Sequence, residues 1–429
     1  MSQIPFFGLG FRRPLRIVSV MAGMCGVGAM VAACSVSSTN ASTPDAGPGT
    51  MPDGGGGTDS SPSGDGATTT SPLGFTPSNV DLSGIDLTKV GDFVVDTTAC
   101  SVDVESNLAS CGDGAGVLGF KIATQADGSK VAVYVAKSIT INAGKDLSIQ
   151  GFGASRPLVL IALETITING TLFGNSRGDV GIAGGMPQKT SRMKGVGPGG
   201  GGAGTGTGAA GGGSYCGLGG AGGVESGTAS TGGAAYGTAE ISPLVAGSSG
   251  GAGDGTGGAG GGAIQLVAGK SITIGSAGLV HVGGGGGGFG GISGQEANAG
   301  GSGGSILLES MAVTVAGTLA ANGGGGGAGT SSDVGGAPPL DPGGADATGN
   351  ATPAAGGKAG IGPSSGGNGS GAASINGTGG SFTAGNAAGA GGGGAGRIRI
   401  NTKSGQATVT GVFSPATTTP CTTQGTIKP

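Results

Sequence analysis

The sequence predicts an all-β fold, a right-handed parallel β-helix or solenoid with long glycine-rich loops inserted between its coils. A short phrase of β-branched and aliphatic residues recurs along the chain, for example at 305–323, and runs of glycine separate its copies. Such short strands cannot stand alone, so the copies must bury their apolar faces on one another, as they do in solenoids. A β-sandwich and separate hairpins are the structural alternatives.

Five stretches, called cassettes below, match this phrase, and in each the second strand follows the first at an offset of seven to nine residues. Within a strand apolar and polar residues alternate, as at Ile272, Thr273 and Ile274, which places one face inward. One cassette per coil, with right-handed crossovers, is therefore expected. The cassettes begin at Val131, Leu158, Ala263, Ser305 and Arg397.

The spacing of the cassettes divides the chain. Residues 131–415 are expected to form the solenoid, residues 73–130 an N-terminal β cap over its first coil, and residues 416–429 a C-terminal tail. Glycine-rich insertions at about 175–262 and 322–396 separate some cassettes. Doubling a loop's length adds only about 0.6 kcal/mol to the cost of closing it, so we expect these insertions to project as mobile or loosely ordered flaps.

The composition excludes several classes of protein. The chain has 429 residues, of which 110 are glycine and only 10% are charged, and it has no tryptophan. Glycine comes in runs rather than at every third position, which excludes collagen. Three of the basic residues lie in the first 16 positions, so the remaining chain has 16 basic and 23 acidic side chains, a balance of −7. This balance leaves no basic surface for nucleic acid.

The N-terminus predicts export and lipid anchoring. Three arginines and no acid precede an apolar stretch at 17–33, which is the length of a secretory signal core. The stretch ends Val31-Ala-Ala-Cys34, which resembles the lipobox of bacterial lipoproteins, in which the cysteine is acylated and becomes the new N-terminus. Residues 1–33 are then a lipoprotein signal peptide. The alternatives are an ordinary cleavage site, an uncleaved membrane helix and a twin-arginine signal at Arg12 and Arg13.

Residues 34–72 are expected to be a disordered tether, because beyond the cysteine the segment has four aspartates, no lysine or arginine and little apolar surface to bury. By resemblance to Gram-negative sorting, a serine rather than an aspartate after Cys34 directs the lipoprotein to the outer membrane. More than one acyl chain on Cys34 would make a durable anchor.

Four cysteines remain after Cys25 leaves with the leader and Cys34 is acylated. An even number in an exported chain favours disulfides, and four cysteines allow three connectivities. Pairing of Cys100 with Cys111 would close a short hairpin in the cap, and we expect Cys216 to pair with Cys421. A zinc site is the rival reading, but the chain has no CxxC pair and only one histidine.

Candidate catalytic, cofactor and metal residues do not emerge from the sequence. His281 alternates with Val280 and Val282, so we expect it to point to solvent. The segment 300–304 has the letters of a G-x-S-x-G nucleophile elbow but lacks the strand-turn-helix context. Among the acids of the cassettes, Glu164 and Glu309 have no companion at a strand-neighbour offset. We therefore predict no catalytic residue, no cofactor and no metal.

Several features together resemble a group of glycine-rich bacterial surface lipoproteins for which no activity is established. They are the lipobox, the tether, the phrases at 75–81 and 156–162 and the glycine-rich β cassettes. The glycine texture is also similar to that of PE-PGRS proteins, although the helical PE domain is absent. The resemblance implies surface exposure and a β-solenoid.

The expected function is a non-enzymatic, lipid-anchored protein with a structural or adhesive role at the surface of the outer membrane. Its partners would be the membrane, through Cys34, and surface polysaccharide or other envelope proteins. The alternative is a carbohydrate-active parallel β-helix enzyme, a polysaccharide lyase or hydrolase, which would need converging carboxylates in a groove. A third hypothesis is a module that captures a peptide by adding a strand at an exposed coil end.

Overall fold

The computed structural model describes residues 71–98, 100–111, 118–151, 156–290, 295–329, 343–358, 364–384 and 387–429. All of them belong to one compact unit. The expected signal peptide, Cys34 and the tether up to residue 70 lie outside the described residues.

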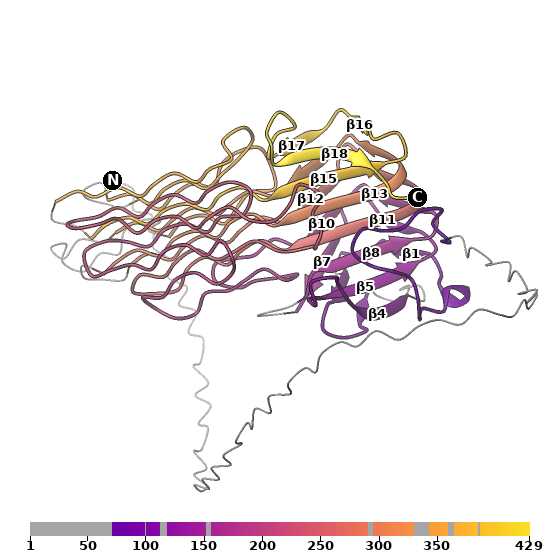
Figure 1. Ribbon diagram of the computed structural model, residues 1–429, viewed down its shortest axis with the longest axis horizontal. Helices are drawn as coiled ribbons and strands as arrows, with labels where there is room; N and C mark the ends of the chain where they lie inside the picture. The colour runs from indigo at the N-terminus through magenta and orange to yellow at the C-terminus, as the bar shows by residue number, and fades with distance from the viewer. Residues whose placement is uncertain are drawn as a thin grey trace, which may run out of the picture. The chain divides into compact units, whose positions relative to one another are not determined.

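The described chain is all-β. Its one helical element is a 3-10 turn, η1 (Leu87–Lys89), and its strands form two sheets that are mostly parallel (Figure 1). The strands are β1 (Phe93–Val95), β2 (Cys100–Asp103), β3 (Ala109–Ser110), β4 (Gly119–Thr124), β5 (Lys130–Ala136), β6 (Ile139–Ile141), β7 (Asp146–Gln150), β8 (Leu158–Ala162), β9 (Thr165–Ile168), β10 (Thr171–Phe173), β11 (Ala263–Ile274), β12 (Leu279–His281), β13 (Ser305–Val315), β14 (Thr318–Ala320), β15 (Arg397–Thr402), β16 (Thr408–Val409), β17 (Val412–Ser414) and β18 (Thr422–Thr426).

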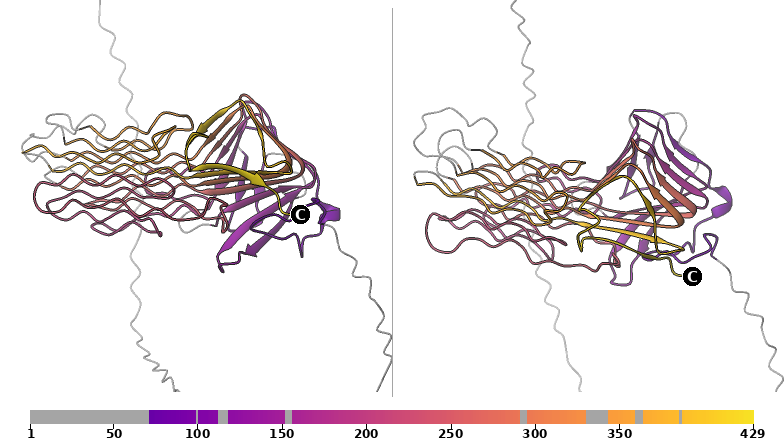
Figure 2. Two further views of the ribbon diagram at one scale, coloured as in Figure 1. Left: turned by 45° about the horizontal axis from the view of Figure 1, so that its top comes forward. Right: turned by 90° about the horizontal axis from the view of Figure 1, so that it is seen from above.

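The five cassettes lie side by side in parallel register. Their first strands pair in the order β5, β8, β11, β13 and β15, so that Leu158, Ile264, Ile306 and Ile398 share one row. A third short strand, in or just after each cassette, pairs in a second sheet, in the order β7, β10, β12, β14 and β17. Each cassette thus has its first and second strands in the larger sheet, and the chain then passes to the other sheet (Figure 2).

The main apolar core lies on the inner faces of the two sheets. Alternating side chains of the cassettes' second strands, such as Ile166, Ile168, Ile272 and Ile274, are fully buried there. These second strands have the single inward face that the alternation predicted, with every second residue buried. Their polar neighbours are partly exposed, as in the pattern of β9, where buried and half-buried residues alternate.

The first strands of the cassettes are buried on both faces, which the alternation did not predict. A second apolar cluster on the outer side of β5, β8, β11 and β13 includes Val133, Ile161 and Leu307. Two segments distant in the sequence contribute to this cluster, the N-terminal strap at 73–80 and a loop at 241–246. Covering the outer face removes apolar surface from water, which is worth about 1.5–3 kcal/mol for each large side chain.

The boundaries of the stack differ from those expected at both ends. β1 and β2, within the expected cap, pair in parallel with β6 and β7 and so continue both sheets, while β4 pairs antiparallel with β5. The expected C-terminal tail is also part of the fold, because β18 pairs in parallel with β15. A bridge between Thr76 and Lys428 joins the strap to the C-terminus.

The glycine-rich insertions are packed and hydrogen-bonded, so the expectation of loosely ordered flaps is wrong for their described residues. They run as long extended segments to one side of the sheets (Figure 1). Three segments distant in the sequence bond to one another through Gly213 N to Gly300 O (2.9 Å), Gly300 N to Gly391 O (3.0 Å) and Gly391 N to Ala210 O (3.0 Å). Each segment thus has neighbours in several directions rather than the two of a sheet. We call this arrangement the glycine array.

The physical reason is the missing Cβ. A Cβ on Gly301 would overlap with the carbonyl oxygen of Ala259, and a Cβ on Gly304 would overlap with that of Gly262. The same holds for most glycines of the array. Only glycine lets extended backbones approach this closely, as at the axis of the collagen triple helix. The backbone bonds between segments satisfy buried N–H and C=O groups that would otherwise lack partners.

Substitution of two glycines should separate this effect from glycine's general flexibility. We expect Gly301→Ala to lower the free energy of unfolding by about 2–3 kcal/mol, because the methyl group forces two backbones apart. Gly288 is the matched control, since a Cβ there meets nothing closer than Asn298 Nδ2 at 3.6 Å. We expect Gly288→Ala to change stability by less than about 0.5 kcal/mol in denaturant unfolding. Equal effects of the two substitutions would contradict close packing of the array.

Candidate functional site

The candidate functional site is a groove where the sheets meet the glycine array, called the junction groove. Its volume is about 380 Å³, which is within the range of small-molecule sites. The starts of β5 and β8, a segment of the first glycine-rich insertion and the loop that covers the outer face of the sheet contribute to it. The lining residues are Ser129, Lys130, Arg156, Pro157, Gly184, Met186, Pro187, Val196, Leu244, Val245 and Ala246.

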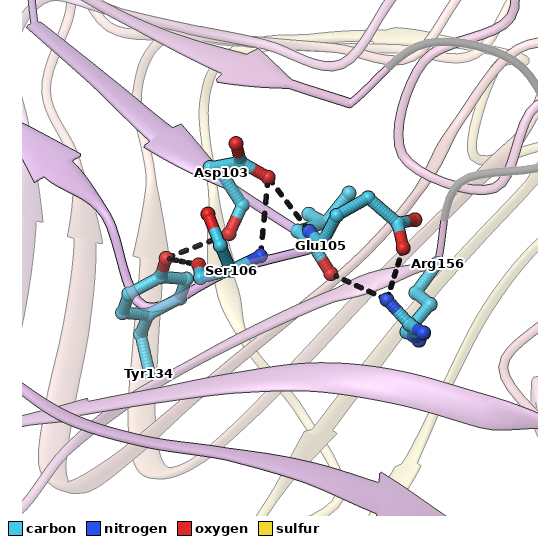
Figure 3. Close-up of polar contacts among 6 residues, drawn as sticks. Asp103, Glu105, Ser106, Tyr134 and Arg156 are labelled. Carbon is cyan, nitrogen blue, oxygen red and sulfur yellow. Dashed lines mark hydrogen bonds and ion pairs between the residues drawn. The ribbon is translucent and has the colours of Figure 1, made fainter.

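Most of the groove's exposed lining is apolar, and two cationic side chains, Lys130 and Arg156, also line it. Arg156 is held by the turn that follows β2 (Figure 3), since its Nη1 donates to the Val104 carbonyl at 3.3 Å and pairs with the Glu105 carboxylate. Lys130 is exposed and forms no ion pair among the described residues. The groove therefore combines an aliphatic wall with one cation that is fixed and one that is free.

The turn that holds Arg156 is itself anchored from inside the stack. The Tyr134 hydroxyl lies within hydrogen-bonding distance of the carbonyl oxygens of Asp103 (2.7 Å) and Ser106 (2.8 Å) (Figure 3). The Leu108 carbonyl oxygen is a third acceptor at 3.1 Å for its single proton. The Asp103 carboxylate accepts from the backbone N–H groups of Glu105 and Ser106. Burial raises the pKa of Tyr134 to about 12, so the hydroxyl keeps its proton at neutral pH. This network fixes the position of Glu105 and, through it, of Arg156.

Both disulfides join the pairs of cysteines that the sequence analysis favoured. Cys100 bonds with Cys111 across 11 residues, next to the Tyr134 network. Cys216 bonds with Cys421 across 205 residues and ties the glycine array to the strand that ends the larger sheet. Among the described residues, no group of three or more histidine, cysteine or acidic side chains could hold a metal ion.

Glu309 has hydrogen-bond partners that its spacing from residues on neighbouring strands did not predict. Its carboxylate is 1% exposed and accepts four hydrogen bonds, from Ser78 N (3.0 Å), Ser78 Oγ (2.6 Å), Gln265 Nε2 (2.7 Å) and Asn401 Nδ2 (3.0 Å). Four donors offset the cost of burying the charge. Because two of them come from the strap, Glu309 fastens the strap to the sheet. Glu164 pairs instead with Lys270 at 3.4 Å.

His281 is buried rather than solvent-facing, which corrects the sequence-based expectation. It alternates with Val280 as predicted, but only 4% of it is exposed. Gly349, from the second glycine-rich insertion, lies over it, since a Cβ there would be 3.5 Å from Nδ1. Burial, with a smaller effect of the Arg177 charge, lowers the pKa of His281 to about 4. The imidazole lies on the outer face of its sheet, but the ordered insertion covers it. The glycine-rich composition of the insertion did not predict this order.

The segment 300–304 also belongs to the glycine array rather than to a nucleophile elbow. Ser302 is fully buried, and its Oγ accepts from the Ser248 backbone N–H at 2.9 Å. Strand β13 follows it directly, so the segment does not have the strand-turn-helix context of a nucleophile elbow.

Two acids that the sequence analysis did not place together lie next to each other in the array. The Asp254 carboxylate bonds with Arg192 Nε and with the backbone N–H of Glu296, both at 2.7 Å. Glu296 is 5% exposed, and its Oε2 has no hydrogen bond. Burial, then the charge of Asp254, raises the pKa of Glu296 to about 7. The two acids are 42 positions apart, on either side of β11 and β12 and in glycine-rich segments without a repeated pattern, so the sequence did not predict their proximity.

A ladder of threonines runs across the outer side of the larger sheet. Each member is the register partner of the next, and none is buried; the members are Thr140, Thr167, Thr273, Thr314 and Thr408. Neighbouring strands lie about 4.8 Å apart, so the threonine ladder presents methyl and hydroxyl groups at that repeat. Thr314 and Thr408 are exposed.

No protein-family model matches the chain, and neither a curated protein nor a solved structure matches it. Among the described residues, no helix is long and apolar enough to cross a membrane.

The raised pKa of Glu296 predicts a pH-dependent stability. The folded state holds a proton that the unfolded chain loses above its pKa of 4.5, so stability falls as pH rises from about 4.5 to about 7. Glu296→Gln should remove this component, which is at most about 3 kcal/mol, and raise the melting temperature at pH 8. The exposed Glu240 offers a control, because Glu240→Gln should leave the pH profile unchanged. A profile for Glu296→Gln identical to that of the original chain would contradict the assignment.

Proposed function

We propose that this chain is a non-enzymatic, lipid-anchored protein of the bacterial outer-membrane surface with a structural or adhesive role. Cys34 would carry the lipid, and residues 35–70 would separate the folded unit from the membrane. The proposed partners are surface polysaccharide or other envelope proteins. The lipobox and the acidic tether support the anchoring part of the proposal.

The two sheets are proposed to be walls of one right-handed parallel β-helix. Parallel pairing of the cassettes and the repeated passage of the chain from the larger sheet to the smaller one and back support this geometry. Crossovers between parallel strands are right-handed in about 98% of cases, which supports the proposed hand.

The observation that carries the structural or adhesive role is the glycine array. Its extended segments are buried and cross-bonded by their backbones over a large part of the chain. Such an array supplies rigid surface and few reactive side chains. The threonine ladder adds a regular face of small polar groups, which suits a partner with a repeating structure.

Anchoring can be tested at Cys34. Cells that express the chain and are fed a labelled fatty acid should incorporate the label into the protein, and Cys34→Ser should abolish the labelling. Cys25→Ser, in the same apolar stretch, is the matched control and should leave labelling unchanged. Labelling that persists in Cys34→Ser would contradict a lipid anchor at this residue.

Adhesion can be tested on the threonine ladder. We expect Thr314→Lys, which places a long charged side chain on the regular face, to reduce cell-to-cell attachment to the level of a deletion strain. Thr228→Lys makes the same change at an exposed position in the glycine array and should have no effect. Attachment by Thr314→Lys cells equal to that of the original strain would exclude the ladder, and equal attachment by the deletion strain would exclude an adhesive role.

A further inference from the structure

We propose that the junction groove binds an anionic amphiphile, with the alkyl chain along its apolar wall and the acidic head at Lys130. This proposal goes beyond a structural or adhesive role. It also does not require the lipid anchor, because every residue that it uses belongs to the folded unit.

The wall of the groove suits an alkyl chain. Pro157, Met186, Pro187, Val196 and Leu244 are its larger apolar lining residues. Val196 is 47% exposed, so apolar surface at the groove is open to a ligand. Methionine fills irregular space and adapts to flexible ligands. Burying an alkyl chain here would remove apolar surface of both partners from water.

A loop that borders the groove carries three further cations. Residues 187–196 form a loop, called the junction loop, whose two ends both line the groove through Pro187 and Val196. The Gln188 side chain donates to the carbonyl oxygen of Lys194 within the loop and fixes its course. Lys189 and Lys194 are exposed and form no ion pair among the described residues, whereas Arg192 pairs with Asp254. Met193, between two of these cations, is 53% exposed.

The concentration of positive charge is notable in a chain that is acidic overall. Two of its basic residues, Lys130 and Arg156, line the groove, and three more, Lys189, Arg192 and Lys194, belong to the junction loop. Glu105 is paired with Arg156 and Asp254 with Arg192, while the Asp127 carboxylate accepts from Ser129 N and Oγ. Lys130, in the groove, and Lys189 and Lys194, in the junction loop, form no ion pair among the described residues. Charge complementarity therefore assigns the ligand a negative head.

The same lining disfavours other anionic ligands. A saccharide would normally stack on an aromatic ring, and none lines the groove. An acidic polymer without apolar groups would gain nothing from the exposed Val196 and Met193. An aliphatic wall beside unpaired lysines fits one molecule that carries both an alkyl chain and an acid. The head could be a free fatty acid's carboxylate or a lipid's phosphate.

The test is titration of the purified full chain with palmitate and, separately, with 1-hexadecanol, which has the same alkyl chain length without the charge. We expect palmitate to bind at least about tenfold more tightly than the alcohol, because the head group forms charge-assisted bonds. Lys130→Glu and Val196→Asp should each weaken palmitate binding by about tenfold or more. Both residues are exposed, so the variants should keep the melting temperature of the original chain.

Lys403→Glu is the matched control. It makes the same charge change at an exposed position just after β15, where the strands end, whereas the groove lies where β5 and β8 begin. We expect Lys403→Glu to bind palmitate as the original chain does. Titration with lysophosphatidic acid distinguishes a phosphate head from a carboxylate head, and tighter binding of either acid than of the alcohol supports the proposal.

Three results would overturn the proposal. The first is that neither palmitate nor lysophosphatidic acid binds. The second is palmitate binding that Lys130→Glu and Val196→Asp leave unchanged, and the third is equal affinity for the acid and the alcohol. Salt-sensitive binding of polygalacturonate in place of palmitate would also overturn it and assign the groove to an acidic polysaccharide. A failure of Cys34 labelling or of the attachment assay bears on the proposed function alone.

Discussion

Close approach of extended backbones is the constraint on which the rest of this structure depends. Carbonyl oxygens lie where the Cβ atoms of Gly301 and Gly304 would otherwise be. With no side chains between the segments, N–H and C=O groups bond from one segment to the next in several directions. Each glycine carries a large cost in chain entropy. In the array, satisfied backbone groups and close packing over many segments offset that cost.

The glycine-rich insertions also determine which outward-facing side chains of the neighbouring sheets are buried. The loop at 241–246 comes from the first insertion and covers the outer face of the cassettes' first strands together with the strap. The second insertion covers His281 in the same way. Ordered insertions thus convert outward-facing side chains of the stack into buried ones. Glu309 is tolerated in this setting only because the strap, β11 and β15 each bring donors to it.

The features with functional promise lie at the boundaries of these parts rather than in the repeat. The junction groove forms where β5 and β8 begin and where the array departs from the sheets. Its fixed cation, Arg156, is positioned by a turn that the Tyr134 hydroxyl holds from inside the stack. A rigid scaffold that presents one groove and one regular threonine face suits recognition at a surface, which is the role proposed for the chain.

The β phrases by themselves determined the all-β class, the identity of the cassettes and their parallel neighbours, because apolar alternation at a constant offset allows few other ways to bury the side chains. The cysteine count and positions likewise indicated the two disulfides. Tertiary structure alone decided the order of the glycine array, the burial of His281 and Glu309, the proximity of Asp254 to Glu296, and the junction groove. The reason is that glycine has no side chain whose pattern could be read. Its backbone bonds join residues such as Gly213, Gly300 and Gly391 whatever the intervening sequence, so only the folded chain shows which segments meet.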